Sequence, residues 1–63
     1  MSQQVEEVRA SVTSEWRTIA QIAGSPYPSA RYEVAKRTLA RMHRDGLVEK
    51  SRDGNVTLWR LRA

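Results

Sequence analysis

The sequence predicts a small α+β domain that contains three helices and a two- to three-stranded antiparallel sheet. The clearest helical pattern covers residues 29–45, where Ala35, Leu39 and Met42 fall on one stripe at about 100° per residue. Residues 47–61 follow at once, and their Asp-Gly dipeptide is a signal for the turn of a β-hairpin. A long amphipathic helix that leads directly into a hairpin therefore organises the rest of the chain.

The length and composition limit what the chain can be. Sixty-three residues are expected to form a single domain, 1–63, and about 60% of the unfolded surface is buried at this size. The sequence has no cysteine, which excludes disulfides and zinc–thiolate sites. No apolar run is long enough for a signal peptide or a membrane span, so we expect an intracellular protein, cytoplasmic or associated with the nucleoid.

Charge is unevenly distributed along the chain, whose formal net charge is +4. Residues 1–24 hold two arginines against three glutamates, a net charge of −1. Residues 25–63 hold nine Lys or Arg against four Asp or Glu, a net charge of +5. Clustered positive charge fits a phosphate-binding surface, although a basic surface without a partner fits the charge alone equally well.

The first helix is expected at residues 2–12. Ser2 suits its N-cap, and Val5, Val8 and Val12 form a narrow apolar stripe. The remaining surface of this helix is polar. We interpret the helix as scaffold, with a dimer contact as the alternative role.

A short strand at 15–17 and a second helix at 18–24 are expected next. The strand requires a partner strand from the later hairpin, and its Trp16 is expected to be buried because of its size. Thr18 and Gln21 match the capping box of a helix start. This helix is apolar nearly all round, so it must pack between other elements.

The turn at 25–28 separates the second helix from the main one, because its two prolines cannot lie inside a helix. Tyr27 in this turn is either a lid on the core or an exposed residue whose hydroxyl reaches a phosphate. Ser29 suits the N-cap of the main helix, and Gly46 suits a left-handed stop at its far end.

Two strands, 47–51 and 56–61, are expected to form the hairpin, with a turn at 52–55. The second strand does not alternate cleanly, because its side chains divide between two faces, with Val56 and Leu58 on one and Thr57, Trp59 and Leu61 on the other. Large apolar residues therefore point both ways. At least one of them is expected at an edge or on the surface of the hairpin.

The order helix, short strand, helix, turn, helix, strand, turn, strand resembles that of the winged helix-turn-helix family of DNA-binding domains. Three stretches carry the resemblance: TIAQIAG at 18–24, the A-x-x-x-L-x-x-M-x-x-x-G-L-V pattern from Ala35 to Val48, and LWRL at 58–61. The resemblance covers residues 3–62, nearly the whole chain. It implies a small winged helix-turn-helix fold in which residues 29–45 are the recognition helix.

This resemblance implies a DNA-binding surface made by the recognition helix and the hairpin, which is the wing. Similar domains place the helix in the major groove and the wing over adjacent phosphates. On the helix, the residues placed outward or at its borders are Ser29, Ala30, Arg31, Glu33, Val34, Lys36, Arg37 and Arg41. On the wing, the implied contacts are Lys50, Arg52 and Asn55, with Arg60 and Arg62 nearby. Arg37 is expected to read a base, because arginine binds guanine O6 and N7, whereas Lys50 and Arg52 are expected to contact phosphates.

The expected function is sequence-specific binding of double-stranded DNA, by a small transcriptional regulator or a phage- or plasmid-type architectural factor. A homodimer and a cooperative assembly of monomers on DNA both stay open. The alternative is a protein–protein interaction module within a larger assembly, which would need an exposed apolar patch on the recognition helix. The basic residues of that helix favour DNA. Winged helices that bind left-handed duplexes carry Asn and Tyr where this chain has Lys36 and Ala40, which disfavours that variant.

No pattern in the sequence indicates an enzyme. The single histidine, His43, lies at the edge of the core stripe, with no nucleophile or carboxylate pair signalled nearby. No glycine-rich phosphate loop follows a strand. We therefore expect no catalytic residue, no metal ligand, no cofactor, no small-molecule ligand and no membrane partner.

Overall fold

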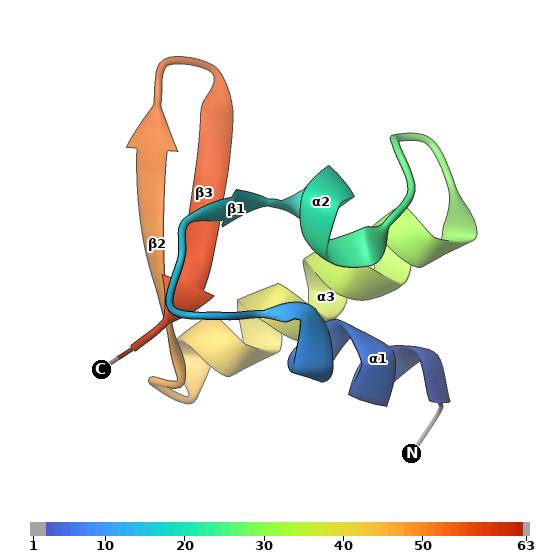
Figure 1. Ribbon diagram of the computed structural model, residues 1–63, viewed down its shortest axis with the longest axis horizontal. Helices are drawn as coiled ribbons and strands as arrows, with labels where there is room; N and C mark the ends of the chain where they lie inside the picture. The colour runs from blue at the N-terminus through green and yellow to red at the C-terminus, as the bar shows by residue number, and fades with distance from the viewer. Residues whose placement is uncertain (1–2, 63) are drawn as a thin grey trace.

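The computed structural model of the protein describes residues 3–62, which form three helices and a three-stranded antiparallel sheet (Figure 1). The elements in chain order are α1 Gln3–Ser11, β1 Arg17–Thr18, α2 Ile19–Ala23, α3 Ala30–Arg44, β2 Val48–Asp53 and β3 Val56–Leu61. The predicted α+β class is confirmed, and the layout is consistent with that of a winged helix. The N-cap predicted at Ser2 lies outside the described residues.

α3 is the element against which the others pack. Both α1 and α2 contact it, and in Figure 1 they cross in front of it. The strand order is β1-β3-β2, so β3 is central and antiparallel to both neighbours, and the β2–β3 turn projects past the helices. α3 has 15 residues, and no helix in the described part of the chain is long and apolar enough to cross a membrane.

The core lies between the helices and one face of the sheet. Its buried side chains are Val8, Val12, Ile22, Ala35, Leu39, Met42, Val48 and Trp59. Ala35 and Leu39 are 0% exposed, which confirms the apolar stripe predicted for the long helix. Because this stripe is enclosed by the other elements, the core fixes the rotation of α3 about its axis. That rotation decides which α3 residues face solvent.

Side-chain caps define the starts of α2 and α3. Thr18 Oγ1 accepts a hydrogen bond from the backbone N–H of Gln21 at 3.2 Å, and Gln21 Oε1 accepts one from the backbone N–H of Thr18 at 3.0 Å. The predicted capping box is therefore confirmed. Ser29 Oγ accepts a hydrogen bond from the backbone N–H of Tyr32 at 3.1 Å, which confirms the predicted N-cap of α3.

A left-handed glycine ends α3. Gly46 has φ +77°, a conformation that residues with a Cβ rarely adopt. Its N–H donates to the carbonyl of His43 at 3.1 Å, and the N–H of Leu47 donates to the carbonyl of Met42 at 2.9 Å. These two hydrogen bonds form a Schellman motif, so the predicted stop is confirmed and β2 starts in a fixed direction.

The strand before α2 differs from the prediction. β1 covers Arg17–Thr18 rather than 15–17, because only these residues reach β3. Trp16 was expected in the core, but it is 38% exposed. Its ring lies beside the guanidinium of Arg60, whose Cζ is 4.3 Å from the ring centroid. A cation–π contact at the surface therefore replaces burial for this residue.

The hairpin turn is shorter than predicted. β2 continues to Asp53, two residues beyond the expected end at residue 51, and Asp53 pairs with Val56. Only Gly54 and Asn55 connect the strands, and Gly54 has φ +62°. A glycine with positive φ at the first central position fits a type II′ turn, whose twist allows the ladder to continue to its last pair.

Candidate nucleic-acid interface

α3 has one buried face and one exposed face. The buried side chains are Ala35, Thr38, Leu39 and Met42. On the opposite side of the helix, the exposed residues are Ala30, Glu33, Lys36, Arg37, Ala40, Arg41 and Arg44. Because these side chains are exposed over the full length of α3, this face is open to a partner.

Most of the α3 residues expected at a DNA surface lie on this exposed face: Ala30, Glu33, Lys36, Arg37 and Arg41. Ser29 is half-buried, because its hydroxyl caps α3 and also accepts a hydrogen bond from Ser25 Oγ at 3.0 Å. Val34 was expected to face outward, but it packs against the core. It lies one turn before Thr38, at the flank of the buried stripe, so the core takes up this apolar side chain.

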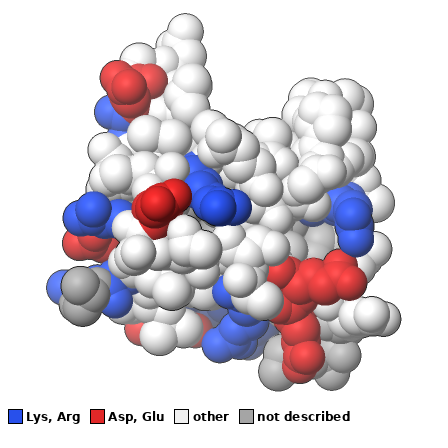
Figure 2. All heavy atoms as spheres, in the orientation of Figure 1, with Lys and Arg blue, Asp and Glu red and all other residues white. Residues whose placement is uncertain are grey.

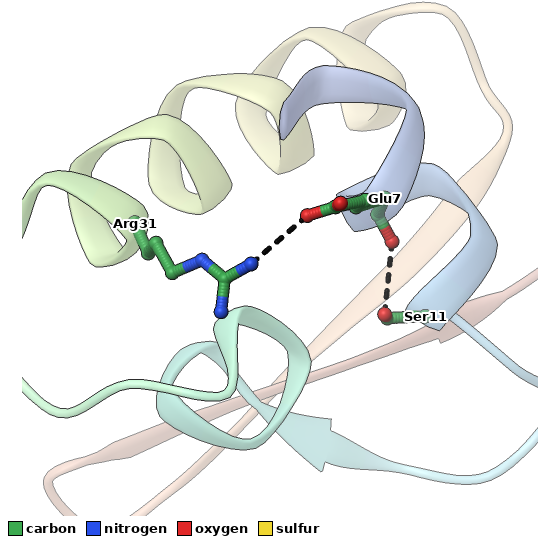
Figure 3. Close-up of polar contacts among 3 residues, drawn as sticks. All are labelled: Glu7, Ser11 and Arg31. Carbon is green, nitrogen blue, oxygen red and sulfur yellow. Dashed lines mark hydrogen bonds and ion pairs between the residues drawn. The ribbon is translucent and has the colours of Figure 1, made fainter. Parts of the chain in front are cut away.

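Arg31 points toward α1 rather than along the exposed face. Its Nη2 lies 3.0 Å from Oε2 of Glu7, and Figure 3 shows the guanidinium reaching from α3 across to α1. The Glu7 backbone carbonyl also accepts a hydrogen bond from Ser11 Oγ at 2.9 Å. Both ion-pair partners are half exposed, so the pair stabilises little. Its geometric effect is to separate Arg31 from the other arginines of α3.

Strand alternation places two cations of the hairpin on the side of α3. Lys50 lies opposite Trp59 in the ladder and Arg52 lies opposite Thr57, so all four side chains share one face. Lys50 Nζ is 5.6 Å from the centroid of the Trp59 ring. The ring of His43, on α3, packs edge-on against the same Trp59 ring at 6.1 Å. We call this face of β2 and β3 the inner face of the hairpin.

The outer face of the hairpin carries its acidic residues. Glu49 Oε2 lies 2.6 Å from Nε of Arg60, which is opposite it in the ladder. Asp53 and Val56 form another pair on this face, and Val56 is 46% exposed. The expectation of an apolar residue on the hairpin surface is therefore confirmed. Arg60 is paired with a carboxylate and points away from α3.

A recess lies between the start of α3 and the hairpin turn. Its volume is about 270 Å³, and its lining includes Thr18, Tyr32 and Asn55. Asn55 is thus brought to the same side of the molecule as the start of α3. Tyr27 is 68% exposed, and its ring meets the Tyr32 ring edge-on at 5.3 Å. Tyr27 is therefore exposed, and the contact of its hydroxyl with a phosphate stays a prediction.

The cations of the exposed α3 face and the inner hairpin face make no ion pair within residues 3–62. In that range the ion pairs join Arg31 to Glu7 and Arg60 to Glu49. The exposed α3 face and the inner hairpin face together carry six cations, and we call the surface that these six form the basic face. They are Lys36, Arg37, Arg41, Arg44, Lys50 and Arg52. In contrast, Figure 2 shows the side on which α1 and α2 lie in front of α3, and acidic side chains gather there over α1. None of these six cations is held in an ion pair among the described residues, so the basic face attracts anions.

Two residues of this surface were not among the expected DNA contacts. Arg44 is exposed, and it lies on the same side of α3 as Arg37 and Arg41, as helical periodicity predicts. Its spacing from Arg37 and Arg41, i, i+4 and i+7, was the signal that placed it on the same face. His43 links α3 to the hairpin through Trp59, and this contact joins residues that no local pattern connects.

The geometry of residues 3–62 gives no sign of a metal site. Among the described residues, no group of three or more His, Asp or Glu could hold a metal ion. Comparisons of the chain with protein-family models, with curated proteins and with solved structures find no significant match. The functional interpretation therefore depends on the geometry and charge of the basic face.

Proposed function

We propose that the protein binds double-stranded DNA and reads its sequence with α3. The observation that carries this proposal is the basic face, in which six cations on two adjacent elements lack carboxylate partners among the described residues. Duplex DNA carries about one negative charge per 1.7 Å of its axis. Closely spaced cations on one side of a small protein match that density of phosphate charge.

The exposed face of α3 suits the major groove. An α-helix with its side chains is about 10–12 Å across, and the major groove of B-DNA is about 12 Å wide. Arg37 lies near the centre of the exposed face, and a guanidinium can donate two hydrogen bonds to O6 and N7 of guanine. We therefore assign base reading to Arg37.

The inner face of the hairpin suits the sugar–phosphate backbone. Lys50 is held beside Trp59, and Arg52 follows it on the same face toward the turn. Contacts to phosphates fix the position of a protein on the duplex without reading its sequence. Asn55, at the rim of the recess, adds a neutral side chain that both donates and accepts hydrogen bonds.

DNA binding of this kind supports a role as a small transcriptional regulator or as a phage- or plasmid-type architectural factor. Both a homodimer and a cooperative assembly of monomers on DNA are compatible with it. The alternative, a protein–protein interaction module, requires an apolar surface on α3. The large exposed apolar side chains of the described residues all lie outside α3: Trp16, Tyr27, Leu47, Val56 and Leu61. The exposed face of α3 therefore favours an anionic partner.

A titration of labelled duplexes at several salt concentrations, followed by fluorescence anisotropy, tests the proposal. Selection from a random duplex pool supplies the preferred sequence, and the random pool is the comparison. We expect the logarithm of the affinity to fall linearly with the logarithm of the salt concentration, with a slope of roughly −4 to −5 for about five phosphate contacts. We also expect one class of sequence to bind much more tightly than the pool.

A pair of charge-matched double variants provides the control. Lys50→Gln with Arg52→Gln removes two cations of the basic face, whereas Arg31→Gln with Arg60→Gln removes two cations that point elsewhere. We expect the first pair to weaken binding and flatten the salt dependence far more than the second. Absence of binding at low salt, or an equal loss in both double variants, would contradict the proposal.

A further inference from the structure

Glu33 is the one acidic residue in α3, and it lies on the exposed face. It sits in the first turn of the helix, almost opposite the buried stripe and one turn before Arg37. Within residues 3–62, Glu33 makes no ion pair with any cation. A carboxylate beside a surface that attracts phosphates weakens binding to DNA in general. Its position next to Arg37 on the exposed face therefore calls for a specific partner.

We infer that Glu33 reads a cytosine in the DNA site of α3, an assignment that rests on the proposed function. An ionised carboxylate only accepts hydrogen bonds, and the N4 amino group of cytosine donates them in the major groove. Guanine presents two acceptors there, and thymine presents an acceptor and a methyl group. Adenine presents a donor next to the N7 acceptor, which repels a carboxylate. Cytosine is therefore the base whose amino group can donate to a carboxylate without a neighbouring acceptor on the same base that repels it.

The place of Glu33 along α3 supports a contact to a base edge. In helix-turn-helix proteins, the N-terminal residues of the recognition helix contact the base edges. The Ser29 cap fixes the turn that carries Glu33, through its hydrogen bond with the Tyr32 N–H. Residues i and i+4 are neighbours on a helix surface, so the cytosine read by Glu33 and the guanine read by Arg37 are expected within roughly one or two base pairs.

A purely structural role for Glu33 makes a different prediction. A carboxylate in the first turn stabilises a helix through the macrodipole. That stabilisation acts on the free protein and is the same for every DNA sequence. Base preference therefore separates the two roles, whereas thermal stability alone does not.

The experiment is selection from randomised duplexes with the wild-type chain and with the variants Glu33→Ala and Glu33→Gln. We expect the wild type to enrich cytosine at one position and Glu33→Ala to lose that preference while binding the random pool more tightly. Glu33→Gln should change the preferred base to adenine, because an amide accepts from N6 and donates to N7. Glu6→Gln removes an exposed carboxylate from α1 and serves as the charge-matched control. This variant should still prefer cytosine at the same position.

A modified base in the duplex then tests the hydrogen bond between Glu33 and the cytosine amino group. Replacing the selected cytosine by 2-pyrimidinone removes the N4 amino group, and should lower wild-type affinity about tenfold more than it lowers the affinity of Glu33→Ala. The same base preference in the wild type and both Glu33 variants overturns the assignment and leaves the proposed function standing. Loss of the cytosine preference in Glu6→Gln also overturns the assignment, because the preference then depends on the total charge of the protein and not on Glu33. A wild-type chain without any DNA binding overturns the proposed function as well.

Discussion

α3 and the hairpin both supply cations to the basic face, but the fold holds the two elements in different ways. α3 has four buried side chains, a serine N-cap and a Schellman stop. The hairpin places only Val48 and Trp59 in the core, and its turn projects beyond the helices (Figure 1). Base reading requires side chains held in a fixed orientation, whereas phosphate contacts do not depend on sequence. We therefore expect specificity to come from α3, and the hairpin to add affinity that is the same for every sequence.

The largest expected effect comes from removing the packing that holds α3. Leu39 is fully buried, so Leu39→Ala should lower the free energy of unfolding by about 2–5 kcal/mol. Leu61, at the end of β3, is 40% exposed, so Leu61→Ala should cost less than about 1 kcal/mol. Urea unfolding followed by circular dichroism measures both. Similar losses in the two variants would show that α3 is held no more tightly than the hairpin.

The second effect concerns the stop between α3 and the hairpin. Gly46→Val should lower the free energy of unfolding by about 1–3 kcal/mol, because a β-branched residue resists positive φ. A Cβ there meets only Arg62 Nη1, at 3.9 Å, so the cost comes from the backbone conformation and not from a clash. Gly46→Asn is the matched control, since asparagine tolerates this conformation better. Equal melting temperatures for all three proteins would contradict the Schellman stop.

The third effect separates two arginines of the same helix. Arg37→Ala should cost about 1–3 kcal/mol of binding on the preferred site and relax discrimination at one base position. Arg31→Ala removes the same side chain from the flank that faces α1, and should leave that discrimination unchanged. Competition binding with single-base variants of the preferred site measures the difference. If Arg37→Ala weakens random DNA as much as the preferred site, Arg37 does not read a base.

The smallest effect concerns the two faces of the hairpin. Lys50→Ala should weaken binding to all sequences similarly and reduce the salt slope by about 1. Arg60→Ala removes a cation from the outer face, where it is paired with Glu49, and should leave the slope unchanged. Anisotropy titrations across salt give both slopes. An unchanged slope in Lys50→Ala would remove Lys50 from the contact surface.

The parts of the fold that could be predicted from the sequence depend on local patterns. The buried stripe of α3 follows from helical periodicity, and its ends follow from a serine and a glycine adjacent to it. The capping box at Thr18 and Gln21 is also local, since its residues are three apart. Each of these features is decided by residues within a turn or two of one another.

The parts that could not be predicted depend on contacts distant in sequence. Trp16 lies at the surface beside Arg60, which is 44 residues later in the chain. The size of the tryptophan side chain alone favours burial. Arg31 turns to a glutamate 24 residues before it, which helical periodicity cannot indicate. The pairing of Glu49 with Arg60 across the outer face of the hairpin follows from the register of β2 and β3, which depends on where the turn falls.

The most direct test of the proposed interface is a titration of the ¹⁵N-labelled protein with its selected duplex, followed by amide chemical shifts. We expect the largest shifts at the exposed residues of α3, around Glu33 and Arg37, and along the hairpin from Lys50 to Asn55. Amides around Glu6 in α1, an element outside the basic face, should shift little. Large shifts over α1 with α3 and the hairpin unaffected would contradict the proposal that the basic face binds DNA.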